Sequence, residues 1–271
     1  QGIYLINELS PKTVDKLLAY GEILSSSIIA RAMYAQGLDA VRKDSRDLIT
    51  TNDKHTKAGV NYKVTNSQVE YYFTKAKQKI TVLPGFIAST AQGETTTLGR
   101  GGSDFTAAIV AAALDVDQVE IYTDVSGMYT ANPKMVKQAK PIDSISYHEA
   151  MELSHFGAKV LYPPTIVPVM SKNIPIRIKN TLQPEDPGTL IHNQEGLSDN
   201  PIKGLSNINN VALLTLEGGG MVGIPGISKR LFETLSNQGI NIILITQASS
   251  EHSICLGVME EDAGKAKNAI D

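Results

Sequence analysis

The sequence predicts an α/β sandwich with a largely parallel sheet, followed by a smaller α+β unit. Helix and strand patterns alternate along most of the chain, which is typical of βαβ units. The polar, turn-rich run HNQEGLSDNPIKG then interrupts the alternation. After it, the order strand, helix, strand, strand, helix is that of a ferredoxin-like unit without its last strand. We therefore expect a first domain over 1–192, a linker over 193–204 and an incomplete second domain over 205–271.

The first elements follow from local start, stop and turn signals. Ser10 and Pro11 form a strong helix start, with serine at the cap and proline at the first helical position. The helical pattern runs to Gly37, with a predicted break near Gly21. Beyond it the patterns predict, in order, strands around 39–43 and 47–50, a helix over about 67–78, an apolar strand run at 79–90 and a hairpin turn at Gly93.

The later elements continue the alternation. The glycine-rich run LGRGGSD leads into an apolar helix, and the strand QVEIYTDV follows. In SISYHEAMELSHFG we predict a helix that Ser146 caps, with Glu149 completing a capping box and Gly157 at its end. The remaining predicted elements are the strands PIRIKN and GTLIH, then the strand NINNVALLTLEG, the amphipathic helix ISKRLFETLSNQG, the strands INIILITQ and SICLGVM, and a helix from about Glu261.

Composition and charge narrow the classes of protein that fit. The 271 residues are 42% hydrophobic and 20% charged, which is typical of a soluble globular protein. A net charge of -3, with no block of like charge, argues against a nucleic-acid partner. Cys255 is the single cysteine and the histidines show no ligand spacing, so we expect neither disulfide nor structural zinc, and a reducing cytoplasm. No apolar run reaches the roughly 20 residues of a membrane span, and no signal peptide is visible.

The run LGRGGSD allows two explanations. Ser103 can cap the following helix, with Asp104 in its first turn. Alternatively, the glycines let backbone N–H groups approach an anionic ligand that Arg100 and the helix N-terminus hold. The run matches neither a Walker loop nor a dinucleotide fingerprint. Arg100 suits a carboxylate, whereas Asp104 beside a phosphate requires an intervening lysine or magnesium ion, so the pair suggests an acidic molecule that receives or loses phosphate.

Further polar residues have both a structural and a functional interpretation. Glu22 is either a solvated helix glutamate or a contact for a substrate ammonium group. After a strand, Asp124, Tyr129 and Lys134 are either turn and surface residues or contacts for a ribose or base, a ring and phosphates. Lys159 is either a cation at a helix end or a ligand contact.

Two features of the second domain allow the same pair of interpretations. The loop GGGMVGIPG precedes a helix and offers backbone donors. Gln247 ends a strand and is either structural or a contact for the polar groups of an amino acid.

Taken together, the motifs resemble those of aspartokinases over nearly the whole chain. The matching runs are GEILSS, LGRGGSDFTA, YTDVSGMYTANPK, ISYHEAMELSHFGAKVLYP, IRIKNT and PGTLI. The tail, from IKGLSNINN to LITQASSEHSI, is similar to the first ACT-type regulatory unit of bifunctional aspartokinase–homoserine dehydrogenases. The resemblance implies an amino-acid-kinase-type three-layer sandwich with an ACT-type domain.

The resemblance also implies an activity. It is transfer of the ATP γ-phosphoryl group to the side-chain carboxylate of L-aspartate, giving 4-phospho-L-aspartate, the first step towards lysine, threonine and methionine. Mg²⁺ would be held mainly by the ATP phosphates, so no protein ligand is assigned to it. The implied effector is threonine, and the implied assembly is a homodimer or higher homo-oligomer formed through the regulatory domains. NADP would serve only a homoserine dehydrogenase part, which these residues do not contain.

The resemblance assigns roles to particular residues. Glu22 and Arg100 would bind the ammonium and carboxylate ends of aspartate, and Asp104 would organise the catalytic lysine. The residues expected beside the substrate are Gly101, Gly102 and Ser103. The residues expected at the nucleotide are Thr123, Asp124, Tyr129, Lys134 and Lys159. The residues expected at the effector are Gly223, Ile224, Gly226 and Gln247.

The sequence departs from the family pattern in three places. It contains no lysine-glycine-glycine-threonine-serine loop, which supplies the catalytic lysine. Tyr162 stands where many relatives have histidine, and Lys134 where arginine is usual. Because both ends also look cut, we expect a piece of an active parent that is itself inactive. The alternatives are an amino-acid-binding regulatory or dimerisation fragment, and a family member that acts on acetylglutamate, glutamate or a nucleoside monophosphate.

Overall fold

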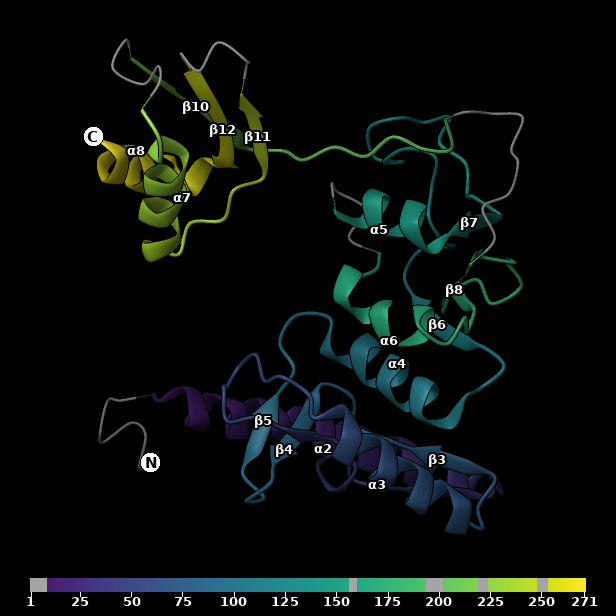
Figure 1. Cartoon of the computed structure of the whole chain (residues 1–271). Helices are drawn as coiled ribbons and strands as arrows, with labels where there is room; N and C mark the ends of the chain where they lie inside the picture. Colours follow the sequence, from purple (N-terminus) through teal and green to yellow (C-terminus); the bar gives the residue numbers. More distant parts are fainter. Residues whose placement is uncertain (1–8, 156–159, 194–201, 219–223, 248–252) are drawn as a thin grey trace. The chain divides into compact units, whose positions relative to one another are not determined.

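The computed structural model divides into two compact units, Gln1–Asn207 and Ile208–Asp271, and each is described by itself (Figure 1). The structure describes residues 9–155, 160–193, 202–218, 224–247 and 253–271. The division falls just beyond the expected linker. Near the end of that linker, Lys203 forms an ion pair of 2.9 Å with Glu149, so this segment packs on the first unit.

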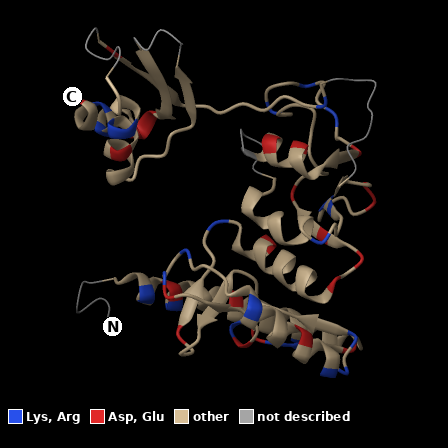
Figure 2. Cartoon of the chain, viewed as in Figure 1, with Lys and Arg blue, Asp and Glu red and all other residues tan. Residues whose placement is uncertain are grey.

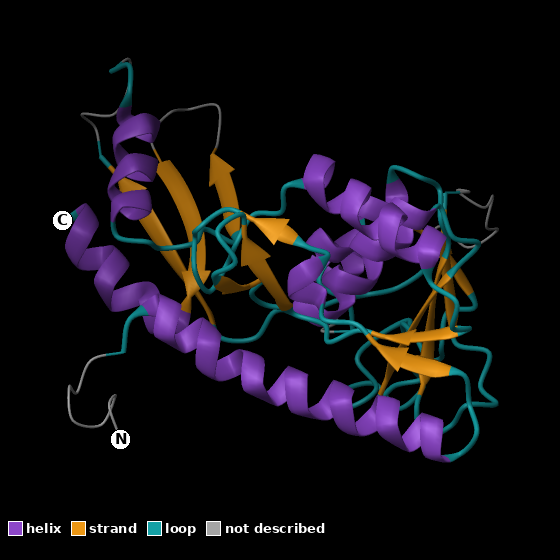
Figure 3. Ribbon diagram, turned by 90° about the horizontal axis from the view of Figure 1, so that it is seen from below, coloured by secondary structure: helices purple, strands orange, loops and turns teal. Residues whose placement is uncertain are grey.

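The first unit begins with the long helix α2 (Pro11–Ala35). Ser10 caps it as predicted, because its Oγ accepts a hydrogen bond from the Thr13 backbone N–H at 3.3 Å. The predicted break near Gly21 is wrong, and Figure 3 shows α2 as one unbroken helix. One glycine disfavours a helix by only about 1 kcal/mol. The packing of α2 against β1 and β5 can outweigh this cost.

Two small sheets follow α2. Their elements are β1 (Ala40–Arg42), the 3₁₀ turn η1 (Ser45–Asp47), β2 (Thr50–Thr51), β3 (Ile80–Val82), β4 (Ile87–Thr90) and β5 (Thr95–Thr97). Strand β1 pairs in parallel with β3, and β4 lies between parallel β2 and antiparallel β5. The predicted hairpin turn is confirmed, with Gly93 at φ +78°. The run 79–90, predicted as one strand segment, instead forms two strands in different sheets.

Helix α3 (Tyr62–Lys75) starts earlier than predicted. Asn61 caps it by accepting a hydrogen bond from the Val64 backbone N–H at 3.3 Å. Asparagine is among the best capping residues, so the start was present in the sequence as a local signal that the periodicity did not reveal.

The second half of this unit holds a four-stranded sheet. In spatial order its strands are β6 (Val119–Thr123), β8 (Ile176–Asn180), β9 (Thr189–His192) and β7 (Ser144–Ser146). The pairs β6–β8 and β7–β9 are parallel, and β8–β9 is antiparallel. The helical elements of this half are α4 (Gly102–Leu114), α5 (Tyr147–His155), η2 (Pro163–Thr165) and α6 (Val167–Met170). The predicted capping box is confirmed, because Ser146 N–H donates to Glu149 Oε2 at 2.8 Å and Glu149 N–H to Ser146 Oγ at 3.3 Å.

Helix α4 joins the two hydrophobic cores of the first unit. Ala108 and Ala111 belong to the core of the four-stranded sheet, whereas Ile109 and Ala113 belong to the core that α3 covers. Figure 1 shows α4 between these two sets of elements. A helix that is apolar on all sides is normally buried, and this burial fixes the start of α4 in space.

The second unit has the predicted strand, helix, strand, strand, helix order. Its elements are β10 (Val211–Glu217), α7 (Ile227–Asn237), β11 (Leu244–Gln247), β12 (Ser253–Met259), the turn η3 (Glu260–Asp262) and α8 (Ala263–Ile270). The sheet is antiparallel in the order β10-β12-β11. Its core joins Leu231 and Leu235 of α7, Ala266 of α8, and Ile254 and Leu256 of β12.

Acidic and basic residues are mixed rather than segregated in each unit, and Figure 2 shows them interspersed along both units. Among the residues that the structure describes, no helix combines the length and the apolar character needed to cross a membrane. The same residues contain no group of three or more histidine, cysteine or acidic side chains arranged to hold a metal ion.

Candidate active site at the start of helix α4

The start of α4 is built from glycine rather than from a side-chain cap. Gly101 is the N-cap residue at φ +68°, no side chain caps the helix, and Gly99 lies at φ +75°. A hydrogen bond of 3.0 Å from the Gly102 N–H to the Gly99 carbonyl closes the turn between them. The expectation that Ser103 caps α4 is therefore wrong, because Ser103 already lies in the first turn, where Asp104 was expected and is found.

The glycines are required because other chain segments approach the helix start closely. A Cβ atom on Gly101 would lie 2.7 Å from Cβ of Tyr162, and one on Gly102 would lie 2.7 Å from the Phe86 ring. Gly85, next to Phe86, would clash with Ser103 in the same way, at 2.9 Å from its Cα. The first turn of a helix carries N–H groups without intrahelical acceptors, so the glycines leave this anion-attracting end of α4 uncovered by side chains of their own.

Arg100 lies in this turn, between Gly99 and Gly101. Its side chain is exposed, and its guanidinium carbon lies 5.8 Å from the centre of the Tyr162 ring. The contact is a cation–π interaction that orients the guanidinium while leaving its donors available. Tyr162 thus supports Arg100.

Asp104 is half-buried in the first turn of α4. Burial raises the pKa of the Asp104 carboxyl above its usual range. A cation placed beside Asp104 would offset the cost of burying its charge.

Replacing Asp104 with asparagine should make the protein more stable at pH 7. The folded-state pKa is raised, so stability falls as the pH rises from the ordinary aspartate pKa of about 3.9 through the folded value. Asparagine does not ionise, so the two stability curves should meet below about pH 3 and separate above it. Denaturant unfolding at several pH values measures the difference. The exposed Asp117→Asn variant is the control, and a less stable Asp104→Asn protein at pH 7 would contradict the prediction.

Glu22 lies on α2, half-buried, and comes from a different element than Arg100. Its backbone carbonyl accepts hydrogen bonds from the hydroxyls of Ser26 at 2.7 Å and Ser25 at 3.2 Å. Among the described residues, no hydrogen bond joins its carboxylate to another predicted site residue. The helix itself contacts β5, the strand that leads directly into Arg100.

The predicted nucleotide residues follow the carboxyl end of β6. Thr123 ends the strand, and its hydroxyl donates to Asp124 Oδ1 at 3.2 Å. Asp124 and Lys134 are exposed and Tyr129 is half-buried, whereas Lys159 lies outside the described residues. The carboxyl ends of parallel strands are the usual ligand side of such sheets, and Asp124 directly follows the end of β6.

This loop is anchored by buried residues that the sequence analysis did not single out. Gly127, at φ +109°, sits on Thr189, and the Met128 N–H donates to Thr189 Oγ1 at 2.8 Å. Ser126 donates hydrogen bonds to Asp186 and to Gln183. Nothing local reveals these contacts, because the partners lie about sixty residues apart in the chain.

The predicted effector residues are dispersed over the second unit. Gly226 is the N-cap of α7 at φ +93°, Ile224 is exposed, and Gln247 is the exposed last residue of β11. Gly223 lies outside the described residues. Within the described part of this unit, no hydrogen bond connects Gln247 to Ile224 or Gly226.

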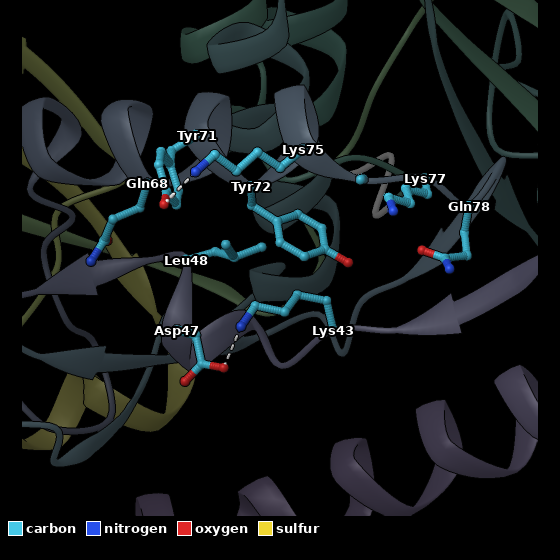
Figure 4. Close-up of a pocket in the computed structure, with 10 residues that line it drawn as sticks. Lys43, Asp47, Leu48, Gln68, Tyr71, Tyr72, Lys75, Lys77 and Gln78 are labelled. Carbon is cyan, nitrogen blue, oxygen red and sulfur yellow. Dashed lines mark hydrogen bonds and ion pairs between the residues drawn. The ribbon is translucent and has the colours of Figure 1, made fainter.

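A separate hollow of about 570 Å³ lies between α3 and η1 (Figure 4). Two of its three lysines have partners, since Lys43 pairs with Asp47 at 2.6 Å and Lys75 bonds to the Tyr71 hydroxyl at 2.7 Å. None of the predicted site residues lines it. The candidate site therefore remains at the start of α4 and the loop after β6.

Comparison with known proteins agrees with this architecture. The model of the amino acid kinase family matches residues 3–180. The chain belongs to the amino acid kinase family. A second family model, described as ACT domain, matches residues 214–271 of this amino acid kinase family member.

Relatives of this family member are aspartokinases. The chain is 39% identical over 277 residues to the chloroplastic bifunctional aspartokinase/homoserine dehydrogenase 1 of Arabidopsis thaliana, covering 100% of this chain and 30% of that protein. It thus spans about 30% of the length of such relatives. Escherichia coli aspartokinase III in complex with lysine and aspartate has a TM-score of 0.75 at 33% identity, covering 92% of this chain and 56% of that one. The complex of aspartokinase III with aspartate and ADP has a TM-score of 0.69 at 26% identity, covering 96% and 75%. The predicted fold class is confirmed: an amino-acid-kinase α/β fold with mostly parallel sheets and an ACT-type domain.

Proposed function

We propose that this chain is the larger part of an aspartate kinase together with its first regulatory unit. An oxygen of the aspartate side-chain carboxylate attacks the γ-phosphorus of ATP, the bond to the β–γ bridging oxygen breaks, and 4-phospho-L-aspartate and ADP result. The observation that carries the proposal is the glycine-built start of α4, with exposed Arg100 held against Tyr162 beside half-buried Asp104.

The residues divide between the two substrates. Arg100 holds a carboxylate of aspartate through its planar fork, and Glu22 holds the ammonium group. Gly101, Gly102 and Ser103 line the acceptor beside the helix N-terminus, which favours its negative charge. Asp104 orients a catalytic lysine. The 271 residues contain no lysine-glycine-glycine-threonine-serine loop that would supply this lysine.

The nucleotide lies at the loop after β6, where we assign it Thr123, Asp124, Tyr129, Lys134 and Lys159. Phosphoryl transfer depends mainly on positioning and on neutralising charge. Mg²⁺ supplies part of that neutralisation when it is bound to ATP. We assign it the ATP phosphates as its main ligands.

The proposal is supported by the relatives, which are named aspartokinases, and by an Escherichia coli aspartokinase III structure described as a complex with aspartate and ADP. Calorimetric titration of the chain with aspartate, glutamate and acetylglutamate in the presence of ADP tests it. We expect heat only with aspartate. Binding of another acceptor in its place would favour a different amino acid kinase activity.

We propose further that the 271 residues alone have no aspartate kinase activity, because they contain no lysine-glycine-glycine-threonine-serine loop. A coupled assay for ADP release with ATP and aspartate tests this, with a longer form of the protein that contains the loop as the positive control. Clear turnover by the 271 residues would show that another group serves as the catalytic lysine.

We propose threonine as the effector, bound by Gln247 and by the loop that contains Gly223, Ile224 and Gly226.

The parent would carry an NADP-dependent homoserine dehydrogenase part, as the names of the relatives suggest. It would assemble as a homodimer or larger through its regulatory domains. A cytoplasmic location is suggested by the single cysteine, although the plant relatives are named chloroplastic.

Replacing Gln247 with alanine should abolish threonine binding to the second unit. The side chain is exposed at the end of β11, so its removal should leave stability within about 0.5 kcal/mol of the parent value. Calorimetry with threonine, lysine and methionine measures the effect, and the exposed Gln238→Ala variant is the matched control. If lysine binds and threonine does not, lysine is the effector. Lysine is included because the aspartokinase III structure is described as a complex with lysine.

A further inference from the structure

Asp15 is a fully buried carboxylate on α2 that no step of the proposed reaction uses. Its Oδ1 accepts a hydrogen bond from the Thr97 hydroxyl at 2.7 Å, and both of its oxygens lie 3.0 Å from the Thr56 backbone nitrogen. Its Oδ2 lies 2.8 Å from Nδ1 of His55. A buried carboxylate is tolerated only when such partners replace water, and Thr97, Thr56 and His55 do so here.

The partners of Asp15 lead to the loop that carries Arg100. Thr56 is held at φ +67°, a left-handed conformation that a threonine rarely adopts. Its carbonyl oxygen would lie 3.2 Å from a Cβ atom on Gly99. Thr97, the other partner, is the last residue of β5 and stands three residues before Arg100. Asp15 therefore contacts Thr97 at the base of the Arg100 loop directly, and reaches Gly99 through Thr56.

Asp15 also fixes the helix that carries Glu22. Glu22 follows it by seven residues, which is close to two turns of the uninterrupted helix α2, so both residues share one side of the helix. The buried hydrogen bonds of Asp15 set both the rotation of α2 about its helix axis and the position of α2 along that axis relative to β5. The two groups that would grip opposite ends of aspartate thus come from elements joined at this carboxylate.

We propose that Asp15 is a positioning residue that sets the distance and orientation between Glu22 and Arg100 for aspartate binding. This inference rests on the proposed function. Binding geometry is sensitive to such contacts, since a misplacement of about 1 Å can change a rate by about 100-fold. Loss of these hydrogen bonds should therefore reduce aspartate affinity selectively and leave the nucleotide loop after β6 unaffected.

Asp15→Asn and Asp15→Ala test the inference by two measurements. Asparagine keeps one acceptor oxygen and the shape of aspartate, whereas alanine removes every partner. We expect aspartate affinity to fall about tenfold in Asp15→Ala and less in Asp15→Asn, with ADP affinity unchanged in calorimetry. Amide hydrogen exchange should become faster at residues 55–58 and 97–103 in the same order.

Asp44→Asn is the matched control. Asp44 is a largely buried carboxylate that also ties α2 to a neighbouring element, because it pairs with Arg42, whose Nε donates to Ser26 Oγ of α2 at 3.0 Å. Its removal should lower stability without faster exchange at 97–103. If Asp15→Ala fails to fold, Thr97→Val removes one hydrogen bond and should give a smaller shift of the same kind.

Two results would overturn the inference. One is unchanged exchange at 97–103 in the Asp15 variants. The other is an equal fall in aspartate and ADP affinity, as a general loss of stability would produce. If the unsubstituted 271-residue chain binds no aspartate, the proposed function fails. The exchange measurement still decides whether Asp15 positions the loop that carries Arg100.

Discussion

Replacing Arg100 with alanine should weaken aspartate binding by about 100-fold. A guanidinium that holds a carboxylate through two charge-assisted hydrogen bonds contributes roughly 2–3 kcal/mol, and each 1.4 kcal/mol is tenfold in affinity. Arg100 is exposed and its recorded contact is the Tyr162 ring, so the unfolding free energy should change by less than about 0.5 kcal/mol. Calorimetric titration with aspartate, alongside denaturant unfolding, measures both effects.

The controls for Arg100 separate charge from geometry. Arg100→Lys keeps the charge but loses the planar fork, so its affinity should fall between those of the parent and Arg100→Ala. Arg31→Ala removes an exposed cation of α2 that has no proposed role, and it should bind aspartate like the parent. Parent-like affinity in Arg100→Ala would remove Arg100 from the acceptor site.

Replacing Gly127 with alanine should lower the unfolding free energy of the first unit by about 3 kcal/mol and weaken ATP binding. Gly127 lies at φ +109°, and a Cβ atom there would be 2.3 Å from Thr189 Oγ1 and 2.8 Å from its backbone nitrogen. Thr189 is itself fully buried, and its hydroxyl donates to the Ile142 carbonyl at 2.6 Å, so it has no free space to occupy. The loop that carries Asp124 and Tyr129 must therefore move.

The matched control is Gly93→Ala. Gly93 also has a positive φ, +78°, but a Cβ atom there would meet nothing within 4 Å. Its substitution should show conformational strain alone, about 1 kcal/mol, and leave ATP binding unchanged. Circular dichroism in urea and titration with ATP compare the two variants. Equal losses in both would mean that the contact with Thr189 contributes nothing.

Some of the candidate site was predictable because it depends on neighbours in the chain. The run LGRGGSD contains its own explanation, since closely spaced glycines permit the positive φ values found at Gly99 and Gly101. The choice between cap and ligand site was not predictable. Gly101, not Ser103, is the cap, and the need for glycine there comes from Tyr162, about sixty residues away in the chain, which packs against it.

What the sequence determined by itself is local: the cap at Ser10, the hairpin at Gly93, the capping box of Ser146 with Glu149, and the element order of the second unit. These features depend on hydrogen bonds and φ preferences within a few residues, which sequence patterns encode directly. The tertiary structure alone decided the continuity of α2 and the partners of Asp15, which lie 40 to 82 residues away in the chain. The reason is physical, because burial can compensate a weak local preference and can hold a carboxylate only where distant donors converge on it.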